Sequence, residues 1–227
     1  MLENAEWAPA SSWLGGALAR FAADNAELAP RTRAVLDSFI SEPARHARML
    51  NTLSLLEHMG SHKIMATQRS AAIDQATLKH VAEEAHHAFF MKRQAEKTAE
   101  RALEYVQADL LAPSSARMYF QRLEGAAVKA LGPKRSALAA YLYMSTVVEF
   151  RALWFYELYQ QALNRARHAL SLKRVLGEER AHLADMAARL QADGDDGGAH
   201  AAELLHIEKL LFARLLRSLE REVDSTH

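Results

Sequence analysis

The feature that most constrains the fold is a repeated Glu-Glu-x-x-His motif, which occurs at residues 83–87 and again at residues 178–182. In each copy the second glutamate and the histidine are three residues apart, so on a helix both side chains project from one face. A single glutamate in an apolar stretch precedes each copy, 27 residues earlier in the first case and 30 in the second. The six residues of this pattern are Glu57, Glu84, His87, Glu149, Glu179 and His182.

The spacing predicts two helical hairpins of matching length. The midpoint of the first interval falls near residue 70, in a polar stretch, and that of the second falls at Asn164. Each arm then rises roughly 20 Å at about 1.5 Å per residue, which brings all six side chains to one level of a bundle. Buried carboxylates at one level are unfavourable unless cations balance their charge. Two divalent cations would balance four glutamates, so the pattern predicts a two-metal site between four helices.

A lone Glu-x-x-His pair is weak support, because the chain contains four of them, at residues 83 and 86, 84 and 87, 179 and 182, and 203 and 206. The last pair has no glutamate at the right distance upstream, and we interpret it as coincidence.

The first motif leaves two registers open. Glu83 and His86 could replace Glu84 and His87 if the helix were rotated. The helical stripe and the second motif favour Glu84 and His87. The outer glutamates, Glu83 and Glu178, are then expected on the solvent side, with an arginine one turn from Glu178 as its surface partner.

Four further residues are candidates for the site. His80 lies one turn before the ligand glutamate of the first motif, and it could be a seventh ligand or a hydrogen-bond partner of a carboxylate. A bystander histidine is the simpler interpretation. Gly60 and Ser61, one turn beyond the first ligand, would either leave room for dioxygen or a small substrate or allow close helix packing. Tyr156 would line that pocket or only pack in the core.

Composition favours helix throughout, because the 227 residues include only 9 glycines and 5 prolines. We expect helices over residues 11–24, 31–40, 43–67, 75–111, 114–131, 135–164, 168–192 and 199–223. In one compact domain, these would form an N-terminal helical extension (1–42), a four-helix bundle (43–192) and a C-terminal packing helix (199–223).

Several classes of protein are disfavoured. The absence of cysteine excludes disulfides, thiolate zinc sites and cysteine nucleophiles. The formal net charge of zero gives no reason to expect nucleic acid or an anionic membrane surface as a partner. No stretch approaches the roughly 20 apolar residues of a membrane helix, and the first twenty residues lack the features of a secretory signal. A cytoplasmic location is therefore expected.

The order Glu, Glu-x-x-His, Glu, Glu-x-x-His over residues 43–192 resembles the ferritin-like di-iron carboxylate superfamily. The resemblance implies an all-α, ferritin-like four-helix bundle with a crossover between helices two and three, formed here by the helix at 114–131, and extra helices at both ends. It implies two iron ions as cofactors, with manganese as the other option. Glu84 and Glu179 would bridge the metals, and each metal would take one further glutamate and one histidine, from Glu57, His87, Glu149 and His182.

The resemblance also implies an activity: a di-iron oxidoreductase that uses dioxygen or peroxide to oxidise a small organic substrate. An external reductant would be needed, because a chain without cysteine cannot carry the cysteine-bound iron centre of rubrerythrins. The alternative is a ferroxidase or iron-binding protein without an organic substrate. A third hypothesis is a bundle that has lost activity and serves assembly. The leucine-rich helix at 199–223 would pack on the bundle or on a second subunit, which leaves a homodimer open.

Overall fold

The computed structural model describes residues 12–68, 73–132, 137–192 and 199–224, and within these ranges it contains eight α-helices, one short 3₁₀ turn and no strand. The all-α prediction is therefore confirmed for the described part of the chain. Residues 1–11, the turn predicted near residue 70 and the start of the helix predicted at 135 lie outside these ranges. The α-helices are α1 (Ser12–Asp24), α2 (Ala29–Ser41), α3 (Pro43–Thr67), α4 (Gln75–Ala99), α5 (Pro113–Leu131), α6 (Ala137–Arg165), α7 (Lys173–Ala192) and α8 (Ala199–Asp224).

The starts of α3 and α4 follow from local signals in the sequence. Pro43 occupies the first turn of α3, where its missing N–H would have had no helical partner, and Glu42 before it is extended. Asp74 caps α4, because its carboxylate accepts a hydrogen bond from the backbone N–H of Thr77 at 2.7 Å. Both helices begin where they were predicted to begin.

The end of α4 was predicted wrongly. The helix expected over 75–111 stops at Ala99, and Glu100 adopts a left-handed conformation with a φ of 53°. The following loop returns to α3, where the side-chain amide of Asn51 donates to two of its backbone carbonyl oxygens at 2.9 and 3.0 Å. Three leucines of this loop are also buried, namely Leu103, Leu110 and Leu111. These contacts outweigh the helix-favouring sequence of the segment.

The start of α7 also differs from the prediction, since the helix begins at Lys173 and not at residue 168. Arg167 is left-handed, with a φ of 50°, and ends the continuation of α6. The backbone N–H of Leu172 then donates to the side-chain oxygen of Gln160 at 2.6 Å, which ties the connecting segment to α6. Asn164, the predicted midpoint of this hairpin, lies in the last turn of α6.

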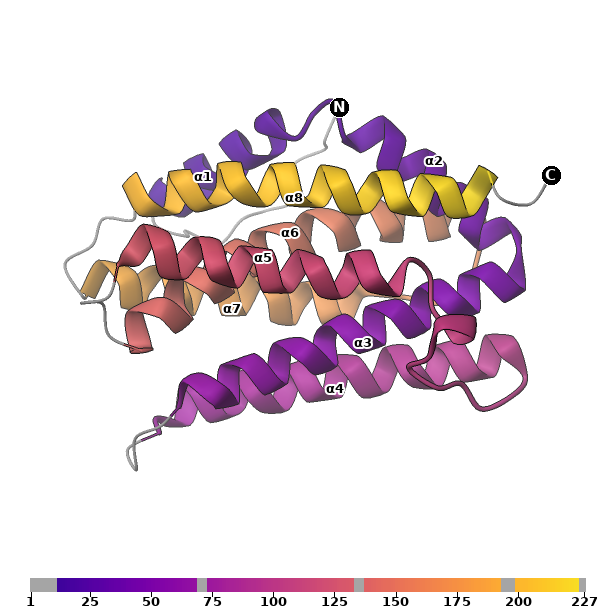
Figure 1. The fold of residues 1–227 in the computed structure, drawn as a ribbon, viewed down its shortest axis with the longest axis horizontal. Helices are drawn as coiled ribbons and strands as arrows, with labels where there is room; N and C mark the ends of the chain where they lie inside the picture. The colour runs from indigo at the N-terminus through magenta and orange to yellow at the C-terminus, as the bar shows by residue number, and fades with distance from the viewer. Residues whose placement is uncertain (1–11, 69–72, 133–136, 193–198, 225–227) are drawn as a thin grey trace.

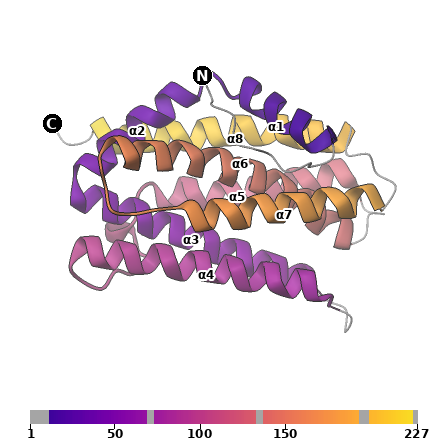
Figure 2. The ribbon, with the colours of Figure 1, turned by 180° about the vertical axis from the view of Figure 1, so that it is seen from behind.

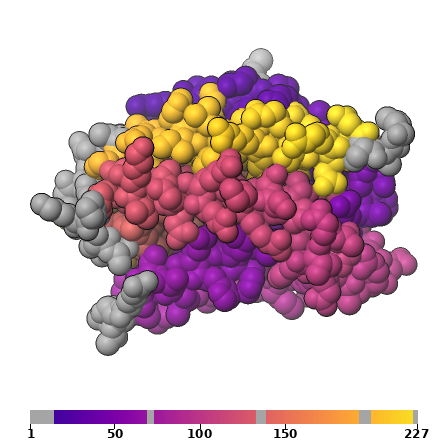
Figure 3. All heavy atoms as spheres, in the orientation of Figure 1, coloured from indigo at the N-terminus to yellow at the C-terminus, as the bar shows by residue number. Residues whose placement is uncertain are grey.

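The helices are arranged so that the motif-bearing ones face each other. Consecutive helices α3 and α4 lie side by side, as do α6 and α7, and contacts between α3 and α6 and between α4 and α7 connect the two pairs (Figures 1 and 2). The α5 helix lies beside α8 on one face of the molecule (Figure 3). Helix α8 also contacts α2 and α6, so within the chain it packs against other helices as expected. No helix among the described residues is long and apolar enough to cross a membrane.

A buried ion pair connects α8 to α6. The guanidinium of Arg151 donates from Nε and Nη2 to the two carboxylate oxygens of Glu208, at 2.8 and 2.7 Å. The same carboxylate accepts a hydrogen bond from the Tyr119 hydroxyl at 2.8 Å, and Arg151 Nη2 also donates to the Asn25 side chain at 2.6 Å. Removing one partner of such a pair would leave an unpaired buried charge, which is strongly destabilising.

Candidate metal centre

The six residues of the repeated pattern meet in the interior between α3, α4, α6 and α7, and His80 joins them. All seven side chains are buried. They form two groups in which one ligand-type atom per residue lies within 4.8 Å of the others, and Glu84 belongs to both. The first group is His80, Glu84, Glu149 and His182, and the second is Glu57, Glu84, His87 and Glu179. These buried groups could hold a metal ion, and the binding role of each residue stays a prediction.

The register of α4 follows the predicted stripe. His86 is exposed whereas His87 is fully buried, which resolves the choice between the two overlapping pairs in favour of Glu84 and His87. Glu203 and His206 are both exposed on α8, away from the site. The buried face of α4 contains every residue of the predicted stripe, namely Thr77, His80, Glu84, His87, Met91 and Ala95.

The two motif histidines direct the same ring nitrogen at the carboxylates. His87 Nδ1 lies 3.3 Å from Glu179 Oε1 and 3.8 Å from Glu84 Oε1. His182 Nδ1 lies 3.3 Å from Glu179 Oε2 and 3.6 Å from oxygens of both Glu84 and Glu149. The two oxygens of Glu179 therefore face one histidine each.

The other ring nitrogen of each histidine bonds to the outer glutamate of the opposite motif. His87 Nε2 lies 2.8 Å from Glu178 Oε2, and His182 Nε2 lies 2.9 Å from Glu83 Oε2. The predicted solvent-side placement of these glutamates is thus wrong in part: both are half-buried, because they face the contact between α4 and α7. The predicted surface pair of Glu178 with Arg174 does form, at 2.9 Å. A carboxylate at Nε2 places the proton there and leaves the Nδ1 lone pair free for a metal.

Several polar atoms at the centre of the cluster have no hydrogen-bond partner, and this bears on whether a metal ion fits the site. Buried polar atoms in proteins almost always have a hydrogen-bond partner. Four buried ligand-type atoms here have none: Glu84 Oε1, His87 Nδ1, Glu149 Oε2 and Glu179 Oε1. A metal ion would satisfy such atoms, and a set of carboxylate oxygens and imidazole nitrogens suits iron, manganese or zinc better than copper(I).

The carboxylates of the metal-free cluster divide into charged and protonated groups. Burial raises the pKa of Glu57 well above its usual value, and the charges of Glu84 and Glu179 raise it further. Burial and the charge of Glu149 also raise the pKa of Glu179. Burial by itself would also raise the pKa of Glu149, but hydrogen bonds to Glu179 and His182 outweigh this effect and lower the pKa to about 2. Without metal, the cluster therefore retains protons on part of its carboxylates.

The histidines provide positive charge to the same cluster. Burial disfavours their charged forms, but the attraction of the neighbouring cluster carboxylates outweighs it and raises the pKa of His80 to about 9, of His87 to about 10 and of His182 to about 12. A metal ion binds the neutral imidazole and the ionised carboxylate, so loading the site would release protons.

His80 is held on both sides. Its Nε2 lies 3.0 Å from Glu149 Oε1 and 3.5 Å from Glu84 Oε1, and its Nδ1 lies 2.8 Å from the Tyr141 hydroxyl. This geometry favours a seventh ligand or a carboxylate partner over a bystander. The sequence interpretation did not single out Tyr141, although its position eight residues before Glu149 places both on one face of α6.

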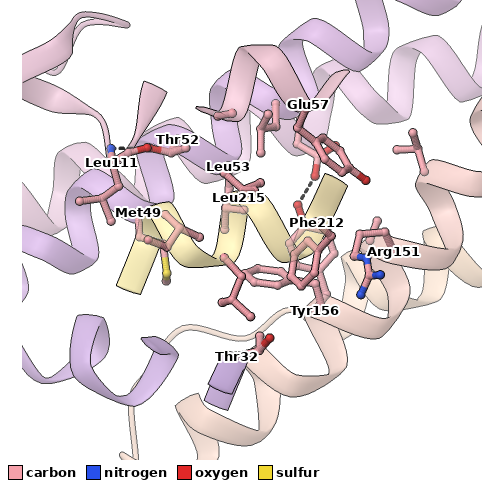
Figure 4. Close-up of a pocket in the computed structure, with 18 of the residues that line it drawn as sticks. Thr32, Met49, Thr52, Leu53, Glu57, Leu111, Arg151, Tyr156, Phe212 and Leu215 are labelled. Atoms are coloured by element: carbon pink, nitrogen blue, oxygen red, sulfur yellow. Dashed lines mark hydrogen bonds between the residues drawn. The ribbon is translucent and has the colours of Figure 1, made fainter. Parts of the chain in front are cut away.

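Two cavities adjoin the cluster. One, of about 110 Å³, is mainly apolar, and Glu57 and Tyr156, which are labelled in Figure 4, line it together with Glu84. The other, of about 130 Å³, reaches His80, Glu84 and Glu149. Gly60 lines both cavities, and a Cβ atom at this position would lie 3.4 Å from Glu84 Oε2.

The three predicted pocket residues differ in placement. Gly60 and Tyr156 line the apolar cavity, and the Tyr156 hydroxyl donates a hydrogen bond to the Glu57 carboxylate. Burial and the charge of Glu57 raise the pKa of Tyr156 well above its usual value, so the phenol holds its proton. Ser61 is buried, but its hydroxyl donates to the backbone carbonyl of His58 at 2.9 Å, and it is not among the residues that line these two cavities.

Replacing Glu178 by glutamine should weaken metal binding without removing a ligand. The amide keeps the shape of the side chain but loses the charge that holds the Nε2 proton of His87, and losses of this kind typically amount to about 10- to 100-fold in metal affinity. A competition titration with zinc and a chelator would measure the change. Glu157→Gln is the matched control, because Glu157 also pairs with an arginine, at 3.0 Å, on the surface. Equal affinities for both variants would show that Glu178 does not support the histidine.

The chain was compared with protein-family models, with curated proteins and with solved structures, and none of them matches. The assignment of a candidate metal centre therefore depends on the buried clusters themselves. Their burial, their unpaired atoms and their nitrogen and oxygen chemistry show that the buried glutamates and histidines of this helical protein could hold a metal ion.

Proposed function

We propose that the protein is a ferritin-like di-iron oxidoreductase that uses dioxygen or peroxide to oxidise a small organic substrate. In this proposal α3, α4, α6 and α7 are the four-helix bundle, and α5 is part of the crossover between α4 and α6. The observation that carries the proposal is the pair of buried Glu and His groups that share Glu84 and leave four ligand-type atoms without a partner. Two bound iron ions would supply one-electron redox chemistry with dioxygen that no side chain in the site can supply.

The protein's own residues have distinct roles in this proposal. Glu84 and Glu179 contact both halves of the cluster, which supports them as bridging ligands. His87 and His182 each present Nδ1 to the cluster while Nε2 is held by an outer glutamate. The Tyr156 hydroxyl holds a proton beside the Glu57 carboxylate, at the boundary between the cluster and the apolar cavity. An external protein would supply the electrons.

The apolar cavity supports an organic substrate. It lies directly against two of the ligand carboxylates, and its walls are mainly leucine, valine and phenylalanine side chains. Such walls exclude water and favour an apolar molecule next to the reactive centre. A protein that only oxidises and stores iron has no need of an apolar chamber beside its ligands.

The alternative is a ferroxidase or iron-binding protein without an organic substrate. The second cavity favours it, because that cavity reaches both Glu149 at the cluster and the exposed Glu124. Glu124 is paired there with Lys63, which lines the same cavity, so the attraction for a cation would come from the carboxylates at the inner end.

Loading with ferrous iron and exposure to dioxygen would separate these functions. We expect the anaerobically loaded protein to hold two irons per chain and to oxidise them in one round. Metal analysis and light scattering after repeated additions of ferrous iron and dioxygen would then detect any mineral growth. Growth well beyond two irons per chain would favour the ferroxidase. Failure to retain iron under anaerobic, iron-replete conditions would exclude both functions.

A further inference from the structure

Three aromatic rings of α6 lead outward from the buried cluster. The first belongs to Tyr156, whose hydroxyl donates a hydrogen bond to the Glu57 carboxylate. The ring centroids of Tyr156 and Phe155 are 5.9 Å apart, and those of Phe155 and Tyr159 are 6.3 Å apart. Centroid separations of this size are those of aromatic side chains in contact. The three rings therefore form a continuous series from a ligand carboxylate to Tyr159.

Two histidines continue this series from Tyr159 to the surface. The ring centroids of His46 and Tyr159 are 5.9 Å apart, and those of His46 and His168 are 4.8 Å apart. Tyr159 is 0% exposed and His46 is 1% exposed, whereas His168 is exposed on the connection between α6 and α7. An external electron donor can therefore contact the outer end of the series while its inner end stays in the core.

Tyr159 and His46 are joined as a phenol and a base. His46 Nε2 lies 2.5 Å from the Tyr159 hydroxyl. Burial raises the pKa of Tyr159 well above its usual value, so the phenol holds its proton. Burial, and to a smaller extent the charge of His168, lower the pKa of His46 to about 4. The imidazole is therefore neutral at pH 7, and one of its nitrogens can accept a proton.

This pairing matters for the redox chemistry of the phenol. A tyrosine that loses an electron becomes a strong acid, and in the interior its proton needs an acceptor within hydrogen-bond distance. A backbone carbonyl oxygen would satisfy a buried hydroxyl as a hydrogen-bond partner, but it is too weak a base to take up the proton. A neutral histidine serves both purposes.

We propose that Tyr159 is a redox relay between the cluster and the surface, with His46 as its proton acceptor. One electron passes from Tyr159 along Phe155 and Tyr156 to the oxidised metal centre. The hydroxyl proton moves to His46 Nε2, which leaves a neutral tyrosyl radical and an imidazolium ion. One electron from the external reductant, delivered at His168, and the return of the proton restore the pair. That the oxidant is an iron centre rests on the proposed function, whereas the pair itself can be oxidised without metal.

Photochemical oxidation of the metal-free, full-length protein tests the pair. The chain contains no cysteine, so Ala169→Cys places a single thiol at an exposed position beside His168 for a ruthenium bipyridyl label. A light flash in the presence of an electron acceptor converts this label to a one-electron oxidant. We expect the electron paramagnetic resonance signal of a tyrosyl radical, and its loss when Tyr159→Phe is added. A signal that Tyr159→Phe leaves unchanged would overturn the proposal.

Two further variants of the labelled protein separate the relay from the fold. Tyr143→Phe is the matched control, because Tyr143 is also a fully buried tyrosine of α6, but its ring contacts His200. It should keep the full radical signal. His46→Gln keeps a polar side chain beside the hydroxyl but removes the base. It should slow radical formation and abolish the slowing in heavy water that we expect with His46 present. An unchanged rate and isotope effect would overturn the role of His46.

The iron-loaded protein tests the connection to the cluster. After the ferrous protein is mixed with dioxygen and rapidly frozen, we expect a tyrosyl radical signal that Tyr159→Phe lacks. The absence of this signal from a protein that holds iron and forms the radical photochemically would overturn the connection between Tyr159 and the cluster. A photochemical radical in a protein that retains no iron would support the Tyr159–His46 pair and contradict only the di-iron function. The failure of one proposal is thus distinguishable from the failure of the other.

Discussion

Glu84→Ala is expected to abolish the binding of both metal ions, whereas Glu149→Ala should impair mainly one. Glu84 belongs to both groups of ligand-type atoms, and Glu149 belongs only to the group that contains His80 and His182. We expect metal content after anaerobic iron loading to fall from two ions per chain to nearly none in Glu84→Ala, a loss of more than about 100-fold in affinity. Elemental analysis after desalting measures it directly.

The control for this experiment comes from the chain itself. Glu203 is the glutamate of a further Glu-x-x-His pair, but it is exposed on α8 and belongs to neither ligand group. Glu203→Ala should retain both ions, which separates the effect of the buried site from that of the motif alone. Circular dichroism of each variant would show whether the helices persist. One ion held at full occupancy by Glu84→Ala would contradict the shared role of this carboxylate.

The six predicted ligands come together because helical periodicity fixes which residues share a face. A repeat of three and four residues along α4 determined that Glu84 and His87 are buried and that His86 is not. The matching distances from Glu57 and Glu149 to their partners determined that the four helices present these residues at one level. These are properties of single helices and of hairpin length, and a sequence contains both.

Contacts that depend on how two helices are rotated against each other were not predictable in this way. Glu83 and Glu178 follow the same periodicity that assigned them to the outer face, yet the contact between α4 and α7 places them against the histidines of the opposite motif. The end of α4 was missed for a similar reason, since the segment after Ala99 is fixed by hydrogen bonds to Asn51, a residue of another helix. The Arg151–Glu208 pair connects positions 57 residues apart, and no local pattern indicates it.

Glu57→Gln is expected to stabilise the metal-free protein and to weaken metal binding. Burial and the charges of Glu84 and Glu179 raise the pKa of Glu57 in the folded state. A carboxyl group with a raised pKa in the folded state contributes stability below its unfolded pKa, and that contribution is lost as the pH rises through the folded pKa. Glutamine resembles the protonated form at every pH. The free energy of unfolding of the variant, relative to that of the unmodified protein, should therefore increase as the pH rises from 5 to 8.

Each unit by which the pKa is raised corresponds to about 1.4 kcal/mol, so we expect the metal-free variant to be more stable by at least about 1 kcal/mol at pH 8. Urea unfolding of the metal-free proteins between pH 5 and pH 8 measures the difference, with the surface variant Glu157→Gln as a control that should change little. In the presence of iron the unmodified protein should be the more stable of the two, because the amide is a poorer ligand than the carboxylate.

The reversal distinguishes a metal ligand from a residue kept for the stability of the fold. A structural carboxylate stabilises the protein under all conditions, and its replacement destabilises the protein with or without metal. A buried ligand carboxylate is unfavourable until the cation arrives, since its neighbours repel it and the low-dielectric interior disfavours its charge. A metal-free Glu57→Gln variant that is less stable than the unmodified protein at pH 8 would support the hypothesis of an inactive bundle. A variant stabilised only without metal would identify Glu57 as a residue retained for binding.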